Sequence, residues 1–185
     1  MSDHKKLIDR AIMLSWFTIA YNLIEGIASV SFGVSDDSMA LTGFGADSFI
    51  EVFSAALVLW RFRSEEGGGP GRSINRERRA TLGIGSLFVL LALITAAGAL
   101  AQLRKGSHPG TTLPGLIISA VSLSFMFFLW STKTRIAKQL DSSTVLKDAN
   151  CSLACIKLSI VLFVGSLIYM IAPALWWSDG VAAIV

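Results

Sequence analysis

Charged residues are scarce in this chain, and histidine is scarcer still. Of the 185 residues, 16% are charged and 53% are hydrophobic, and the mean hydropathy is +0.63. Soluble domains carry about 25% charged residues, so the deficit excludes an ordinary soluble domain and predicts a single membrane domain. The two histidines, His4 and His108, both lie outside the apolar runs. An intramembrane hydrolase needs a nucleophile with a base, or a metal ion with an open position, so we expect no enzyme.

The charge balance does not indicate nucleic-acid binding. The formal net charge is +3 and the isoelectric point is near 9.1, but the basic residues lie in short connectors between apolar runs. They gather in the N-terminal tail and after the second and fourth runs, Lys133 included, whereas Arg104 and Lys105 lie on the opposite side. This positive-inside pattern predicts a cytoplasmic N-terminus, and we expect the cell (inner) membrane.

The apolar runs predict an all-α membrane protein, a bundle of six transmembrane helices in one domain over residues 1–185. The expected spans are 11–32, 39–60, 80–101, 112–130, 148–171 and a partial sixth, 175–185. The first run is too long for a signal peptide and has no small-residue cleavage site, so it should remain as a span. A sixth helix from Leu175 would reach about 16 Å into roughly 30 Å of hydrocarbon. We therefore expect a truncated sixth helix and no C-terminal cytoplasmic domain.

Asp47 and Glu51 lie at the centre of the second predicted span. Acidic groups at that depth cost several kcal/mol each unless they pair or bind something. Their i, i+4 spacing sets both on one helix face, where two anions repel each other but can hold a divalent cation. The sequence therefore predicts half of an intramembrane metal site, with a structural hydrogen-bond network as the alternative.

Cys151 and Cys155 repeat this spacing in the fifth predicted span, and Asp148 lies on the same face. Counted from the cytoplasmic ends, Glu51 and Cys155 lie at similar depths of roughly 15 Å. Two carboxylates and two thiolates could bind zinc tetrahedrally, and thiolates also favour cadmium. A disulfide within one helix would be strained, so we expect free thiols; the alternative is that both are small buried core residues.

Four further polar residues are predicted to have accessory or pathway roles. Asn22 and Glu25 of the first span should face protein or water rather than lipid. Glu25 either lines the cation path or, the preferred reading, pairs with Lys157 at a comparable depth. Asp179 is expected to be a gate or helix-start residue rather than a ligand.

With these residues in place, the chain resembles the cation diffusion facilitator family of divalent-metal/proton antiporters over nearly its whole length. The matching residues are Asn22, Ser38-Met39-Ala40-Leu41 leading to Asp47 and Glu51, Asp148-Ala149, and Trp177-Ser178-Asp179. The resemblance implies that the second and fifth helices bind zinc midway across the membrane through Asp47, Glu51, Cys151 and Cys155, and that the protein is a homodimer. The family's usual fifth-helix pair is histidine and aspartate, whereas both positions are cysteine here.

The predicted function is efflux of divalent cations from the cytoplasm in exchange for protons, with zinc first and cadmium, cobalt or other divalent ions as further substrates. Metal binding needs deprotonated ligands, so protons and metal compete for one site. Four anionic ligands around one dication would leave a charge of about −2, which is costly in a low-dielectric site. Either one ligand stays protonated, or Cys151 does not bind the ion and Asp148 or water takes its place. The alternative function is a membrane metal sensor or partner subunit that does not transport.

Overall fold

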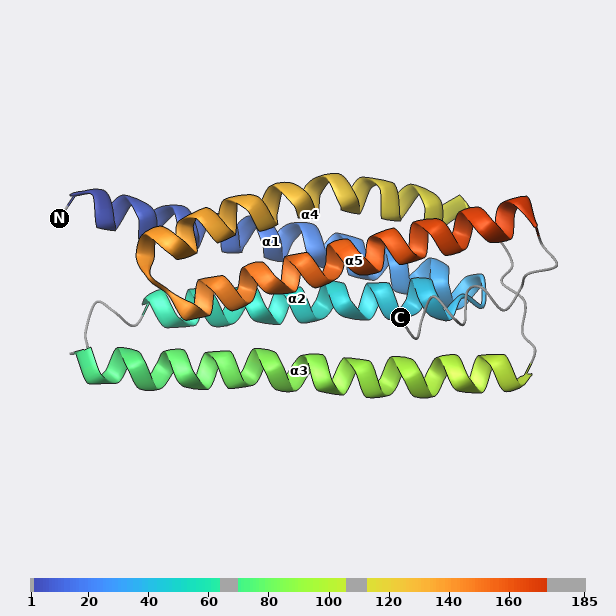
Figure 1. The fold of residues 1–185 in the computed structure, drawn as a ribbon, viewed down its shortest axis with the longest axis horizontal. Coiled ribbons are helices and arrows are strands. Elements are labelled where there is room, and N and C mark those ends of the chain that lie inside the picture. Colours follow the sequence, from blue (N-terminus) through green and yellow to red (C-terminus); the bar gives the residue numbers. More distant parts are fainter. Residues whose placement is uncertain (1, 64–69, 106–112, 173–185) are drawn as a thin grey trace.

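The computed structural model describes residues 2–63, 70–105 and 113–172, and every regular element within them is an α-helix (Figure 1). The helices are α1 (Ser2–Ser35), α2 (Met39–Arg63), α3 (Pro70–Lys105), α4 (Leu113–Leu140) and α5 (Ser143–Ile171). The predicted all-α class is confirmed. The predicted sixth span, 175–185, and Asp179 lie outside the described residues.

Four of these helices are long and apolar enough to cross a membrane, which makes the chain an integral membrane protein. They are α1, α2, α4 and α5, over His4–Ser35, Met39–Phe62, Leu113–Leu140 and Ser143–Ile171. The expected count of six spanning helices is wrong for the described part of the chain. The third helix carries a shorter apolar stretch, Leu82–Gly98, within its described residues.

The helices extend beyond the predicted spans, since hydropathy marks the apolar part of a helix rather than its ends. The fourth helix passes the predicted end at residue 130 and continues to Leu140. With 28 residues it is about 42 Å long at 1.5 Å per residue, more than the roughly 30 Å of hydrocarbon in a bilayer. Residues predicted to form a connector therefore lie inside the bundle.

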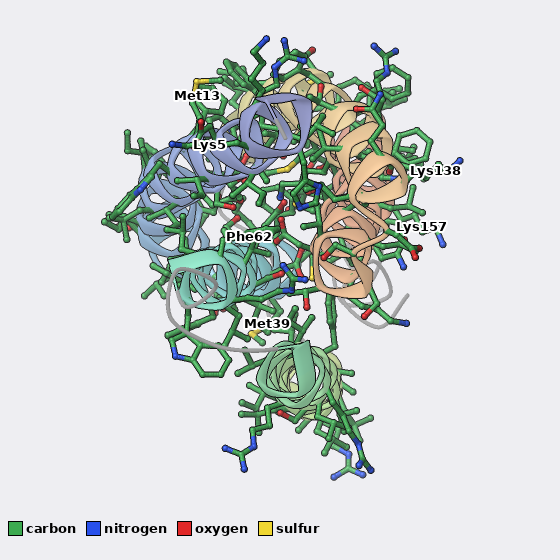
Figure 2. All side chains as sticks on the ribbon, turned by 90° about the vertical axis from the view of Figure 1, so that its left-hand side faces the viewer. Lys5, Met13, Met39, Phe62, Lys138 and Lys157 are labelled. Atoms are coloured by element: carbon green, nitrogen blue, oxygen red, sulfur yellow. The ribbon has the colours of Figure 1, made fainter. Side chains whose placement is uncertain are left out.

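The helices α1, α2, α4 and α5 form the core of the bundle, and α3 lies outside it, packed mainly against α2 (Figures 1 and 2). Met39 of α2 projects toward Gly98 of α3 (Figure 2). The apolar core includes Leu14, Phe44, Val58, Met126, Leu129 and Leu162, which come from all four core helices. Many large apolar side chains, such as Met13, Ile24 and Phe127, are exposed on the outer surface, as a lipid-facing surface requires.

The helices α1 and α2 pack closely against each other at Gly45. A Cβ atom added at Gly45 would lie 2.8 Å from the backbone nitrogen of Val30, so α1 and α2 could not pack this closely with any larger residue there. The hairpin between them is short, with Asp37 at a φ of 54° and the Ser38 hydroxyl accepting from the Leu41 amide. This packing fixes the face of α2 that carries Asp47.

Candidate functional site

Polar side chains line the interior of the four-helix core. Four acids are buried there: Glu25 on α1, Asp47 and Glu51 on α2, and Asp148 on α5. Serines from all four helices surround them, namely Ser15, Ser29, Ser48, Ser54, Ser119, Ser122, Ser152 and Ser159. Ionisable groups inside a membrane bundle are costly, so this concentration makes the interior the candidate functional site.

Lys133 of α4 lies at the centre of one part of this interior and is 2% exposed. Its Nζ atom is 3.1 Å from Oε1 of Glu51 and 3.0 Å from Oδ2 of Asp148, and it donates to the Ser152 hydroxyl at 3.0 Å. An ammonium group has three donors, and here each has an oxygen partner. The Ser152 hydroxyl in turn donates to Oε1 of Glu51. We call Lys133, Glu51, Asp148 and Ser152 the lysine cluster; it ties α4 to both α2 and α5.

Cys151 is connected to the lysine cluster through Ser54. The Ser54 hydroxyl donates to Oδ1 of Asp148 at 2.6 Å, and the Cys151 thiol donates to the Ser54 hydroxyl at 3.3 Å. Cys151 is therefore held at the Asp148 end of the interior.

Asp47 and Cys155 form a second, smaller group, which we call the acid–thiol pair. The Cys155 thiol donates a hydrogen bond to the Asp47 carboxylate, and both side chains are fully buried. Among the described residues, neither Oδ2 of Asp47 nor Oε2 of Glu51 has a hydrogen-bond partner. A buried acceptor without a donor costs about 1–3 kcal/mol, and more when it is charged, so these two atoms are suited to receive a cation or a proton.

Glu25 is held by hydroxyl groups. The Tyr21 hydroxyl donates to its Oε1 atom at 2.8 Å and the Ser48 hydroxyl to its Oε2 atom at 3.0 Å. The predicted pairing with Lys157 is wrong, because Lys157 is exposed and lies on the outer side of α5 (Figure 2). It follows Cys155 by two residues, which turns it about 200° around the helix from the interior face.

Asn22 is fully buried, in agreement with its predicted orientation toward protein. Its Nδ2 atom donates to the Thr18 carbonyl at 3.0 Å, and its Oδ1 atom has no hydrogen-bond partner among the described residues.

The four predicted ligands do not converge in this structure. Within residues 2–63, 70–105 and 113–172, no three His, Cys, Asp or Glu side chains are grouped so that they could hold a metal ion. Asp47 pairs with Cys155, Glu51 with Lys133, and Cys151 with Ser54. Both cysteines are free and buried, which confirms the prediction of free thiols.

Lys133 is the buried residue of the candidate site that the sequence did not predict, since the prediction ends the fourth span before it and assigns it to a basic connector. The signal that could have found it is helical periodicity. The buried face of α4 includes Met126, Leu129, Lys133 and Ile136, at helical spacings of three or four residues. Because Lys133 lies on the same helix face as these buried apolar residues, its charge is expected inside the bundle rather than at the membrane surface.

Comparisons with known proteins give a relative of this chain that is named as a transmembrane protein. No protein-family model matches it. It is similar to a protein named Transmembrane protein 163 from Xenopus laevis, with 27% identity over 178 residues. The alignment covers 95% of this chain, and the chain spans 62% of the length of that relative.

These findings correct the family assignment. The relative that aligns with nearly the whole chain carries a different name from the cation diffusion facilitator family, so the prediction of membership in that family is wrong. The resemblance rested on short motifs, and two carboxylates at i, i+4 recur wherever one helix face carries negative charge. Such motifs point to chemistry but do not identify a family.

Proposed function

We propose that this protein transports divalent cations, zinc first, across the membrane in exchange for protons. The observation that carries the proposal is the buried negative charge. Lys133 forms ion pairs with Glu51 and Asp148 but supplies only one positive charge for the two carboxylates, and Asp47 has a thiol as its neighbour and keeps one oxygen without a hydrogen-bond partner among the described residues. Buried charge is rarely tolerated unless it is paired or binds an ion, and a mobile cation would provide the missing charge.

The donors proposed for the substrate ion are Asp47, Glu51 and Cys155, with Cys151 or Asp148 as a fourth. Carboxylate oxygens and thiolates suit zinc, and the same donors would accept cadmium or cobalt. Because the donors are dispersed in the described arrangement, binding requires the facing side chains of α2 and α5 to move together. A bundle that opens alternately to the two sides would then exchange metal for protons, since both compete for the same donors.

The proposed orientation has the N-terminus in the cytoplasm and efflux across the cell (inner) membrane. The support is that the N-terminal end of α1, which carries Lys5 and Lys6, and the C-terminal end of α4, which carries Lys138, lie at the same end of the bundle (Figure 1). A homodimer stays a prediction, because it rested on the family resemblance alone.

The test is zinc uptake into proteoliposomes that contain a zinc-sensitive dye. We expect uptake that depends on a pH gradient and is abolished by Asp47→Asn. The matched control is Asp9→Asn, which makes the same change at an exposed position of α1. Zinc uptake that is equal in wild type and Asp47→Asn, or absent from wild type, would contradict the proposal.

The alternative is a metal-binding membrane protein that does not transport, a sensor or partner subunit. The observation that favours it is the lysine cluster, which joins α2, α4 and α5 and would resist alternating opening. Calorimetry on the same preparation decides between the two. Zinc binding that Asp47→Asn removes, without zinc flux in wild type, would identify the sensor or partner subunit.

A further inference from the structure

We propose that Lys133 is a tethered counter-cation: it occupies the carboxylates of the substrate site while no metal ion is bound, and its ammonium group leaves when one binds. The inference rests on the proposed function and adds a residue on α4 that takes part in substrate binding without being a ligand. It follows from the position of Lys133, from the state of the two Glu51 oxygens, and from the distance between Lys133 and the end of its helix.

The Lys133 ammonium group is bound as an ion would be. Three oxygen atoms, from Glu51, Asp148 and Ser152, lie 3.0–3.1 Å from its Nζ atom. The oxygens come from two helices that face each other, α2 and α5, and the lysine enters from a third. A charge of +1 is thus already present beside the donors that a divalent ion would need.

Glu51 links the lysine to the substrate ion because its two oxygens differ. Oε1 binds Lys133 and accepts from Ser152, whereas Oε2 is buried without a hydrogen-bond partner in the described residues. An ion bound to Oε2 and to Asp47 would lie within a few ångströms of the ammonium group. Two cations at that separation repel each other, and this repulsion opposes simultaneous occupancy of Glu51 by both.

Lys133 has a short way out of the site. It precedes the end of α4, Leu140, by seven residues, which corresponds to about 10 Å along the axis. A lysine has a flexible four-carbon stem and can extend its charge toward an aqueous boundary. When Lys133 leaves, α4 loses its ion pairs to α2 and α5. Ion binding would therefore release the ion pairs that join these three helices in the metal-free state.

The direct test is acetylation of wild-type lysines by sulfo-N-hydroxysuccinimide acetate, read by mass spectrometry with and without zinc. We expect saturating zinc to raise the acetylation rate of Lys133 about tenfold or more, because the amine moves from the buried cluster to water. Lys138 is the matched control, since it is exposed on the same helix and its rate should not change. A parallel sample with magnesium shows whether the response is specific.

Two variants measure the competition by calorimetry. Lys133→Met removes the competing cation, so zinc should bind about tenfold tighter or more, whereas Lys133→Arg keeps the charge and should bind no tighter than wild type. A purely structural lysine predicts the reverse for Lys133→Met, because a disturbed site would bind zinc more weakly.

The outcomes separate the two proposals. Wild type that binds no zinc overturns the proposed function and this inference together. Wild type that binds zinc while Lys133 remains protected, with no gain in affinity in Lys133→Met, overturns the inference alone. The labelling experiment uses the wild-type chain, so a variant that folds poorly leaves it decisive.

Discussion

The two carboxylates of α2 lie one turn apart, yet the protein treats them differently. Glu51 belongs to the lysine cluster, where an ammonium group and a serine hydroxyl both bind its Oε1 atom. Asp47 belongs to the acid–thiol pair, where a thiol is its neighbour and one oxygen is left without a partner. The difference shows that one half of the site already holds a fixed cation, whereas the other half holds none among the contacts of the described residues.

Glu25 shows a third way to hold a buried acid. Both of its oxygens accept hydrogen bonds from neutral hydroxyl groups, those of Tyr21 and Ser48. Like Glu51, Glu25 accepts hydrogen bonds from side chains of the bundle. Like Asp47, it has no ion pair with a lysine or arginine among its hydrogen bonds to the described residues. The unfolding free energy of a Glu25→Gln variant is therefore a suitable reference for variants of Glu51 and Asp47.

The largest effect on stability should come from removing the fixed charge. Lys133→Met leaves Glu51 and Asp148 buried and unpaired, and breaking a buried pair in this way costs about 3–5 kcal/mol. Chemical denaturation in mixed micelles, followed by helix content, measures the free energy of unfolding. Because Lys138 is exposed, Lys138→Met should change that free energy by less than about 0.5 kcal/mol.

A double variant shows whether the cost comes from charge. Lys133→Met combined with Asp148→Asn should recover much of the loss, because fewer unpaired anions remain, and the double-mutant cycle isolates the pair. If Lys133→Met alone lowers the unfolding free energy by less than about 1 kcal/mol, its ion pairs contribute no more than exposed salt bridges do. That result would contradict their burial in the bundle.

The second effect concerns the hydroxyl that completes the lysine cluster. Ser152→Ala removes an acceptor from Lys133 and a donor from Glu51, so we expect a loss of about 1–3 kcal/mol in unfolding free energy. Ser159→Ala is the matched change on the same helix, where the partners are the Ser122 hydroxyl and the Cys155 carbonyl. Hydrogen bonds between neutral groups contribute about 0.5–1.5 kcal/mol, so the control should lose less. Equal losses of unfolding free energy in the two variants would show that the charges of Lys133 and Glu51 do not strengthen the hydrogen bonds of Ser152.

Local sequence patterns predicted the parts of this structure that depend on one helix at a time. The spans at 11–32, 39–60 and 148–171 correspond to apolar parts of α1, α2 and α5. The i, i+4 spacings correctly set Asp47 with Glu51, and Cys151 with Cys155, on buried faces. Periodicity determines which side of a helix is polar, and that is a property of the local sequence.

The partners of the buried acids could not be predicted in the same way. Glu51 and Lys133 are 82 residues apart, and no local pattern joins them. The positive-inside rule treats a lysine near a helix end as interfacial, which directs attention away from Lys133. The predicted pairing of Glu25 with Lys157 was wrong because it relied on their similar depth in the membrane. Lys157 lies on the outer face of α5 and cannot reach the interior. Depth and face both have to agree before two residues on different helices can meet.

A smaller effect on stability is expected at the acid–thiol pair. Asp47→Asn removes a charge whose Oδ2 atom has no partner, so unfolding free energy should stay within about 1 kcal/mol of wild type or rise slightly. Asp148→Asn, measured in the same way, should cost more because it leaves Lys133 with one ion-pair partner fewer. A large loss in Asp47→Asn would show that Asp47 has a structural role like that of Asp148.

The smallest change is expected for zinc binding in Cys151→Ser. The Cys151 thiol donates to Ser54 and lies at the Asp148 end of the interior, and a serine hydroxyl can replace that hydrogen bond. Zinc affinity, measured by calorimetry, should therefore change little, because the hydrogen bond to Ser54 is kept and the group does not bind the ion. Cys155→Ser is the matched variant one turn away, and it should weaken binding about tenfold or more because a hydroxyl is a poor substitute for a thiolate ligand. Equal weakening in both variants would instead support a site with four ligands, in which Cys151 leaves Ser54 to bind the ion. That result would select Cys151 over Asp148 as the fourth donor, and it would require Cys151 and Cys155 both to reach the α2 carboxylates.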